Sequence, residues 1–178
     1  MIKKINLIIV TFFGIGYIKY APGTAASIAA CLVLYLIFRF GNLFFSFYIF
    51  LFIIFLFFYS LYAITDAQEK FVKKDPKQIV VDEVIGMSIP IYFFEYFLFF
   101  SSDTFDNLTY HPLGLHWTFY TSLLILFRFF DIYKPFPINW FDKKIKNSFG
   151  VLFDDILASV YTIITAALLL IVQEILFF

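Results

Sequence analysis

The sequence has little of what a nucleic-acid-binding protein or a disulfide-rich secreted protein carries. Its 178 residues include a single cysteine, and 13 basic side chains are balanced by 13 acidic ones, so that the formal net charge is zero. Cys31 lies in an apolar run, which excludes a disulfide framework and a cysteine-based metal site within one chain. No stripe of Lys and Arg interleaved with aromatic residues is present, so we expect no nucleic-acid partner.

Apolar residues, in contrast, make up 62% of the chain and include 29 Phe. A membrane-spanning helix takes about 20 apolar residues. The continuous apolar stretches are 25–40, 43–64, 84–100, 115–130 and 156–178. The sequence therefore predicts an all-α fold, a polytopic membrane helix bundle with about five transmembrane helices, which forms one membrane-embedded domain over residues 1–178. It gives no indication of the oligomeric state.

The N-terminal segment differs from these stretches, because only a short apolar run precedes a segment rich in glycine. Residues 14–23 contain Gly14, Gly16, Pro22 and Gly23. Glycine and proline interrupt a helix. The pattern predicts an interfacial or re-entrant segment that leads into the first transmembrane helix.

The basic residues indicate how the bundle is oriented, since short cytoplasmic loops are enriched in Lys and Arg. They gather before the first apolar stretch, between the second and third, and between the fourth and fifth, at Lys3, Lys4, Lys19, Lys70, Lys73, Lys74, Lys77, Lys134, Lys143, Lys144 and Lys146. The alternate connections are nearly free of them. We therefore predict a cytoplasmic N-terminus and an external C-terminus.

With this topology, every unusual polar cluster falls on the cytoplasmic side. The clusters are 14–24, 66–83 and 128–155. Segments that are distant in sequence but meet at the same ends of a helix bundle can build one site. His111 and His116 fall on the other face, and Cys31 lies within a span, which argues against a mechanism with a His or Cys nucleophile at this site.

The segment RFFDIYKPFP, from Arg128 to Pro137, spaces two cations around an acid. If it is helical, Arg128, Asp131 and Lys134 lie on one face at intervals of three. One interpretation is that Arg128 and Lys134 extend to the membrane surface, with Asp131 as their partner. The other is a binding site for an anion.

Two pairs of adjacent acids stand where apolar stretches begin: Asp82 with Glu83, and Asp154 with Asp155. Acids in the first turn of a helix interact favourably with its dipole, which explains either pair alone. Two pairs on one side of the membrane favour a second interpretation, because clusters of oxygen ligands suit Mg²⁺. Gly86 and Ser159 are expected to keep the adjoining helix faces open.

Thr24 follows Pro22 and Gly23 at the start of the first long stretch. It is either a simple N-cap or part of a phosphate site at the helix N-terminus. The glycines of this segment have neither the lysine spacing of a Walker loop nor the strand context of a dinucleotide-binding motif.

Three blocks of sequence resemble the bacterial phosphatidylglycerophosphatase A family. They are PGTAAS at 22–27, IVVDEVIGM at 79–87 and RFFDIYKPFPINWFDKKIKNSFGVLFDDILAS at 128–159. The last is the most specific, because it combines D-x-x-K-P-x-P-I with a paired Asp. The family often has Gly where this chain has Ala26, and a Gly pair where it has Asn147 and Ser148, while all the charged positions are retained.

The resemblance implies a Mg²⁺-dependent lipid phosphatase of the bacterial cytoplasmic (inner) membrane, with its active site on the cytoplasmic face. Its substrate would be phosphatidylglycerophosphate, hydrolysed to phosphatidylglycerol and phosphate. The implied Mg²⁺ ligands are Asp82, Glu83, Asp154 and Asp155. The implied phosphate-binding residues are Thr24, Arg128 and Lys134, and the implied catalytic residues are Asp82, Asp131, Lys134 and Asp155. Whether water or an Asp attacks the phosphorus is left open.

An ion or solute transporter that uses interfacial carboxylates is the alternative, because carboxylates in membrane proteins also mark ion paths. A transporter predicts acids in the middle of its spans. Here only Glu95 lies in the interior of an apolar stretch, and the stretches show no inverted repeat.

Overall fold

The computed structural model describes residues 2–40, 43–68, 77–101, 117–145 and 147–177. These residues form seven α-helices and one short 3₁₀ helix, η1, with no strand among them. In chain order the elements are α1 (Ile2–Val10), η1 (Ile15–Tyr17), α2 (Pro22–Phe40), α3 (Leu43–Gln68), α4 (Val81–Ser101), α5 (Trp117–Tyr133), α6 (Ile138–Lys144) and α7 (Ser148–Phe177). The all-α prediction is confirmed. The predicted loop with His111 and His116, and the cluster residues 69–76, lie outside the described residues.

Five of the helices coincide with the five predicted apolar stretches. Within the part of the chain that the structure describes, three helical segments are long and apolar enough to cross a membrane. The three are Pro22–Phe40, Phe47–Gln68 and Ser148–Gln173. Helix α5 has 17 residues, which is at the short end of the range of about 17–25 residues for a span. Helix α4 carries Asp82, Glu83 and Glu95. A membrane protein is supported, whereas the count of five spans is not confirmed.

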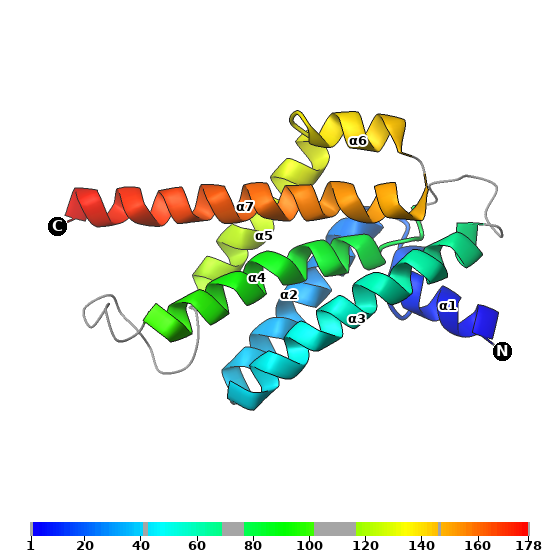
Figure 1. Cartoon of the computed structure of the whole chain (residues 1–178), viewed down its shortest axis with the longest axis horizontal. Helices are drawn as coiled ribbons and strands as arrows, with labels where there is room; N and C mark the ends of the chain where they lie inside the picture. Colours follow the sequence, from blue (N-terminus) through cyan, green and yellow to red (C-terminus); the bar gives the residue numbers. More distant parts are fainter. Residues whose placement is uncertain (1, 41–42, 69–76, 102–116, 146, 178) are drawn as a thin grey trace.

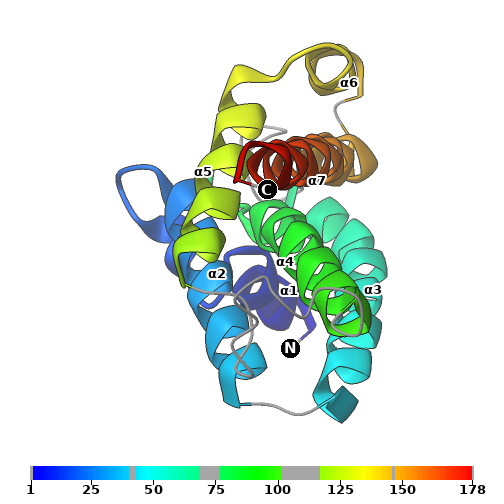
Figure 2. The same ribbon diagram turned by 90° about the vertical axis from the view of Figure 1, so that its left-hand side faces the viewer.

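Helix α4 occupies the centre of the bundle. It packs against α2, α3, α5 and α7, as Figures 1 and 2 show from two directions. Met87, Ile91 and Phe94 of α4 are almost fully buried among these neighbours. The outer faces of α3 and α7 expose large apolar side chains such as Phe55 and Leu168, as a lipid environment allows.

The N-terminal segment is a short helix that packs against α3, not a span. The Asn6 side chain is fully buried and links two α3 residues. Its Nδ2 donates to Asp66 Oδ2 at 3.0 Å, and its Oδ1 accepts a hydrogen bond from the Tyr59 hydroxyl at 2.7 Å. Because buried polar groups need partners, this network holds α1 on α3.

The turn after α1 supports the beginning of α4. The Val80 backbone N–H donates to Val10 O at 2.9 Å, one residue before α4 begins. A Cβ added at Gly16 would collide with the carbonyl of Gln78. The glycine therefore allows two backbones to approach closely, and the N-terminal segment fixes the chain from which Asp82 and Glu83 project.

Helices α4, α5 and α7 pack tightly where Gly86 and Ser159 meet, so the expectation that these residues keep helix faces open is wrong. A Cβ at Gly86 would lie 2.8 Å from Phe127 Cζ and 3.1 Å from Asp155 Cβ. The Ser159 hydroxyl donates to Gly86 O at 2.6 Å and lies 2.7 Å from Asp155 O. Small residues let α7 approach α4, which brings the acids of the two helices together.

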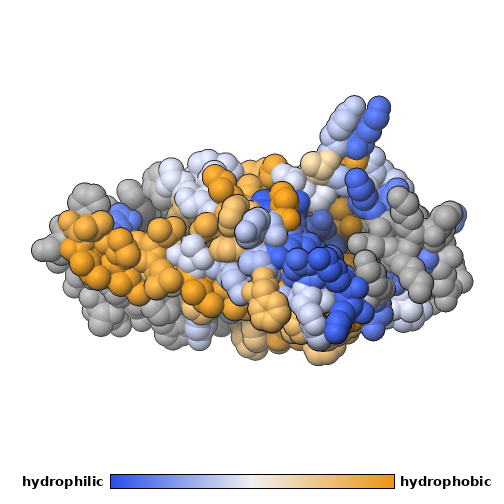
Figure 3. All heavy atoms as spheres, turned by 90° about the horizontal axis from the view of Figure 1, so that it is seen from above, coloured by the Kyte–Doolittle hydropathy of each residue, from blue (hydrophilic) through white to orange (hydrophobic). Residues whose placement is uncertain are grey.

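Polar side chains concentrate at one end of the molecule. Figure 3 faces the side that carries α6, and shows hydrophilic residues gathered there while hydrophobic residues cover the end at which α7 terminates. The asymmetry agrees with the predicted gathering of the polar clusters on one side.

Candidate active site

A cavity of about 430 Å³ opens where the ends of α2, α4, α5, α6 and α7 meet. Its wall contains four cationic residues besides the acids, and two of these, Arg128 and Lys134, were predicted for the site. The lining residues include Lys19, Gly23, Lys77, Asp82, Glu83, Arg128, Asp131, Lys134, Asp142, Asp154 and Asp155. The three sequence-distant clusters thus meet in one pocket, as predicted.

Three carboxylates form the tightest group in this cavity. Asp82, Glu83 and Asp155 each place one oxygen within 4.8 Å of the others. The first two project from the first turn of α4, and the third comes from α7. Such close anionic groups repel one another unless a cation lies between them.

The acids of α7 have no capping explanation. Helix α7 begins at Ser148 and has no acid in its first turn, whereas the sequence placed Asp154 and Asp155 at the start of the span. The helix starts earlier because Asn147 accepts a hydrogen bond from the Gly150 N–H at 3.0 Å. Asp154 and Asp155 are both buried, within the second turn or beyond. Burial of two adjacent acids needs a compensating charge.

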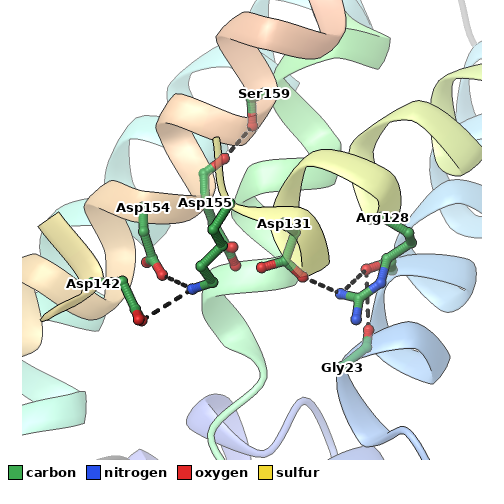
Figure 4. A network of polar contacts seen from close by, with 9 residues as sticks. Gly23, Arg128, Asp131, Asp142, Asp154, Asp155 and Ser159 are labelled. Carbon is green, nitrogen blue, oxygen red and sulfur yellow. Dashed lines mark hydrogen bonds and ion pairs between the residues drawn. The ribbon is translucent and has the colours of Figure 1, made fainter. Parts of the chain in front are cut away.

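Arg128 and Asp131 pair within α5, as their spacing predicted. Arg128 Nη1 lies 2.7 Å from Asp131 Oδ2. Asp131 and Asp155 point toward the same space in Figure 4. The Arg128 guanidinium therefore provides positive charge at the edge of the carboxylate group.

Lys134 does not continue the helical face of Arg128 and Asp131, which corrects the prediction for these three residues. Helix α5 ends at Tyr133, and Lys134 has a φ of 46° in the left-handed region. Pro135 explains the helix end, because a residue before proline is disfavoured in the α conformation. The turn directs the Lys134 ammonium to Asp154, with which it forms an ion pair, and to Asp142 Oδ1 at 3.1 Å.

Asp142 of α6 is a site residue that the sequence prediction missed. The only signal was its place in FDKK within the predicted polar cluster 128–155, which also fits a surface acid beside lysines. Burial lowers the pKa of Lys134, but the charges of Asp154, Asp155 and Asp131 outweigh this effect and raise the pKa above its ordinary value. The ammonium therefore stays protonated between its acidic partners.

Gly23 rather than Thr24 forms the wall of the cavity at the start of α2. A Cβ at Gly23 would collide with the Glu83 carboxylate and lie 3.4 Å from Arg128 Nη1. Thr24 is half-buried and is not among the lining residues. Its predicted role in phosphate binding stays a prediction.

The polar atoms left without partners show what the cavity can accept. Among the described residues, Asp82 Oδ1, Glu83 Oε2, Asp154 Oδ1 and Arg128 Nε are buried without a hydrogen-bond partner. Buried polar groups are normally satisfied, so this set fits a ligand that combines a cation with an anion. An all-oxygen donor set suits Mg²⁺, and Asp82, Glu83 and Asp155 are the residues that would hold it. Asp154 differs from these three acids, because one of its carboxylate oxygens already forms an ion pair with Lys134.

A bundle of apolar helices with a pocket of acids and cations at one end defines a helical membrane protein whose polar site suits a charged headgroup. The chain belongs to the phosphatidylglycerophosphatase A family, whose model matches residues 8–170. The resemblance stated from the three sequence blocks is therefore confirmed, and with it membership of a family of phosphatases.

Individual relatives agree with this assignment. A phosphatidylglycerophosphatase A of Haemophilus influenzae is 51% identical over 51 residues, which cover 29% of this chain and 31% of that protein. The phosphatidylglycerophosphatase A of Escherichia coli is 28% identical over 83% of this chain and 73% of its own length. A putative phosphatidylinositol-3-phosphatase of Bacteroides thetaiotaomicron is 30% identical over 90% of this chain and 91% of its own length. No solved structure matches the chain.

Proposed function

We propose that this protein hydrolyses the phosphate monoester of phosphatidylglycerophosphate to give phosphatidylglycerol and phosphate, with Mg²⁺, at the cytoplasmic face of a bacterial inner membrane. One observation carries the proposal: a single cavity places the carboxylates of Asp82, Glu83 and Asp155 within 4.8 Å of one another and also contains Arg128 and Lys134. Family membership supplies the reaction class.

Each group in the cavity has a role that follows from its charge. Asp82, Glu83 and Asp155 hold Mg²⁺, which when bound supplies positive charge to the phosphoryl oxygens. Arg128 binds the phosphate oxygens, and Asp131 orients its guanidinium through their ion pair. Lys134, protonated and held by Asp154 and Asp142, adds a second cation beside the phosphate.

The apolar surroundings favour a lipid as the substrate. The cavity lies at the ends of helices whose outer faces expose apolar side chains, so a headgroup can enter it while the acyl chains stay among the helices. The cytoplasmic side is supported by the lysines that gather at this end, among them Lys19, Lys77, Lys143 and Lys144.

The decisive experiment measures phosphate release from phosphatidylglycerophosphate by the purified protein in detergent, with Mg²⁺ and with EDTA. We expect Mg²⁺-dependent release, and we expect its rate to fall by more than about 100-fold in Asp155→Asn. Mutating residues that only hydrogen-bond to a metal ligand already lowers metal affinity or activity by about 10–100-fold. Glu95→Gln is the matched control. It makes the same acid-to-amide change at a site outside the cavity, where the carboxylate accepts a hydrogen bond from Tyr120.

The same assay separates the proposal from its alternatives. Phosphatidylinositol-3-phosphate is included as a second substrate, because the relative from B. thetaiotaomicron carries that name. Preference for this lipid would overturn the proposed substrate while retaining the site. Loss of activity in Glu95→Gln with full activity in Asp155→Asn would overturn the site itself.

A further inference from the structure

Helix α6 connects the catalytic segment of α5 to α7 and has two distinct faces. Ile138 is fully buried, and Phe141 packs against Phe153 of α7 with ring centroids 4.8 Å apart. The opposite face carries Asn139, Trp140, Lys143 and Lys144, all of which are exposed. This alternation is that of an amphipathic helix. The inner face is already satisfied by α7, so the outer face is free to contact something else.

The outer face borders a groove separate from the catalytic cavity. The groove has a volume of about 320 Å³ and is lined by Phe136, Asn139, Trp140, Lys143 and Lys144. None of these residues lines the catalytic cavity. Phe136 is 80% exposed, although its carbonyl accepts a hydrogen bond from the Tyr161 hydroxyl at 2.8 Å. The backbone is thus anchored while the ring remains available.

The groove combines aromatic rings with positive charge, and no acid of the described residues forms an ion pair with Lys143 or Lys144. Lys144 Nζ lies 4.8 Å from the centre of the Trp140 ring, and Lys143 is exposed beside it. The nearest acid of α6, Asp142, faces the catalytic cavity and pairs with Lys134. Tryptophan is favoured at the boundary between headgroups and acyl chains, and lysines near that boundary attract anionic lipids.

We propose that the outer face of α6 is a binding surface for anionic phospholipid headgroups, with Lys143, Lys144 and Asn139 contacting the phosphate and Phe136 and Trp140 contacting the glycerol and upper acyl region. The charge complementarity and the position of the helix between two apolar helices carry this inference. It goes beyond the proposed reaction, because the groove binds a lipid that is not being hydrolysed.

Trp140 provides a direct probe. The chain has two tryptophans, and a Trp117→Phe background leaves Trp140 as the sole indole. The protein is reconstituted in phosphatidylcholine vesicles that contain unlabelled phosphatidylserine. In one sample the phosphatidylserine is replaced by its acyl-brominated form. In a second sample the phosphatidylserine stays unlabelled, and the same mole fraction of phosphatidylcholine is replaced by acyl-brominated phosphatidylcholine. Phosphatidylserine is chosen because the proposed reaction neither consumes nor forms it, so the catalytic cavity does not contribute.

We expect brominated phosphatidylserine to quench Trp140 about twofold more strongly than brominated phosphatidylcholine, and the excess to diminish at high salt. The excess disappears in Lys143→Gln/Lys144→Gln, while the charge-preserving Lys143→Arg/Lys144→Arg and the distant Lys4→Gln retain it. Quenching by brominated phosphatidylcholine reports that Trp140 still contacts the bilayer in each variant.

Two results would overturn the proposal. Equal quenching by the two lipids in the parent protein would show that the face contacts the membrane without selecting anionic headgroups. No quenching by either lipid would show that the face points to water, and would leave it to an aqueous partner such as an acidic protein. Quenching by either lipid is measured without phosphate release, so its result tests the lipid-binding surface independently of the proposed function.

Discussion

Lys134 is the residue whose surroundings differ most from the sequence prediction, because two acids share its ammonium. Asp154 is buried, while the Asp142 side chain is 36% exposed and lies on a separate short helix. With one acidic partner alone, the Lys134 ammonium would move toward that carboxylate. The ion pair with the second acid holds the ammonium between the two, so that it stays directed into the cavity.

We predict that Asp142→Asn lowers kcat/KM for the phosphatase reaction by about tenfold, which corresponds to about 1.4 kcal/mol. The expected change is mainly in KM, because Lys134 retains its charge but loses a positioning partner. Steady-state kinetics measure the two parameters. Asp142→Glu restores the charge and is expected to recover part of the loss. A fall in kcat alone, with KM unchanged, would contradict the positioning role.

Some residues of the candidate site can be predicted from the sequence alone, and others cannot. Asp82, Glu83, Arg128 and Asp131 were identified because charged side chains at the ends of apolar stretches are costly to bury and therefore conspicuous. Asp142 was missed, because an acid beside two lysines is ordinary on a surface. Only the three-dimensional placement of α6 distinguishes the two situations.

Helix starts decide how close the site residues come to one another. Helix α2 begins at Pro22, and Gly23 in its first turn approaches the Glu83 carboxylate of α4. A methyl group at this position would displace the carboxylate rather than the backbone, since the side chain is the part that can move. The glycine thus controls the position of one proposed metal ligand.

Gly23→Ala is therefore expected to raise the Mg²⁺ concentration needed for half-maximal activity by about tenfold, equivalent to about 1.4 kcal/mol. Thermal stability should change little. A Mg²⁺ titration of phosphate release measures the effect. Ile28→Ala is the control, because it removes a side chain that is 42% exposed on the same helix, away from the cavity. An unchanged Mg²⁺ requirement in Gly23→Ala would mean that Glu83 is not a ligand.

A glycine substitution in the N-terminal segment is expected to lower stability, in contrast to Gly23→Ala. Gly16→Ala would push a methyl group into the Gln78 carbonyl, where backbone on both sides resists movement. We expect a loss of stability of about 1–3 kcal/mol, as for other overpacked positions. Denaturation in detergent, followed by circular dichroism, measures it. Unchanged stability would show that η1 and the 77–80 segment separate without cost.

At the element scale, the sequence predicted the long helices well because continuous apolar stretches are the strongest signal that a chain contains. It placed the start of α7 too late, because 148–155 mixes acids with apolar residues and does not read as part of a span. The sequence also predicted that Gly86 and Ser159 keep helix faces open. In the structure they let helices pack closely, and sequence alone does not show which helix lies against a small residue.

The whole molecule is polarised. The elements that line the cavity and the α6 groove lie toward the same end as the N-terminal segment, and apolar surface covers the other end. Two different arguments bear on the side of the membrane that this end faces. The lysines favour the cytoplasm. The proposed substrate must also meet the cavity in the leaflet that carries it, so the orientation of the bundle determines which pool of lipid the enzyme can use.

Single cysteines test this orientation in a Cys31→Ser background. The predicted cytoplasmic end is represented by Lys4→Cys and Lys143→Cys, and the other end of α2 by Phe40→Cys, whose native side chain is 82% exposed. In intact bacterial cells a membrane-impermeant maleimide should label only Phe40→Cys, and permeabilisation should expose the other two. The reverse pattern would place the cavity outside, and the enzyme would then need its lipid substrate in the outer leaflet. Labelling of all three in intact cells would mean that Pro22–Phe40 does not cross the membrane, although its length and composition allow it to.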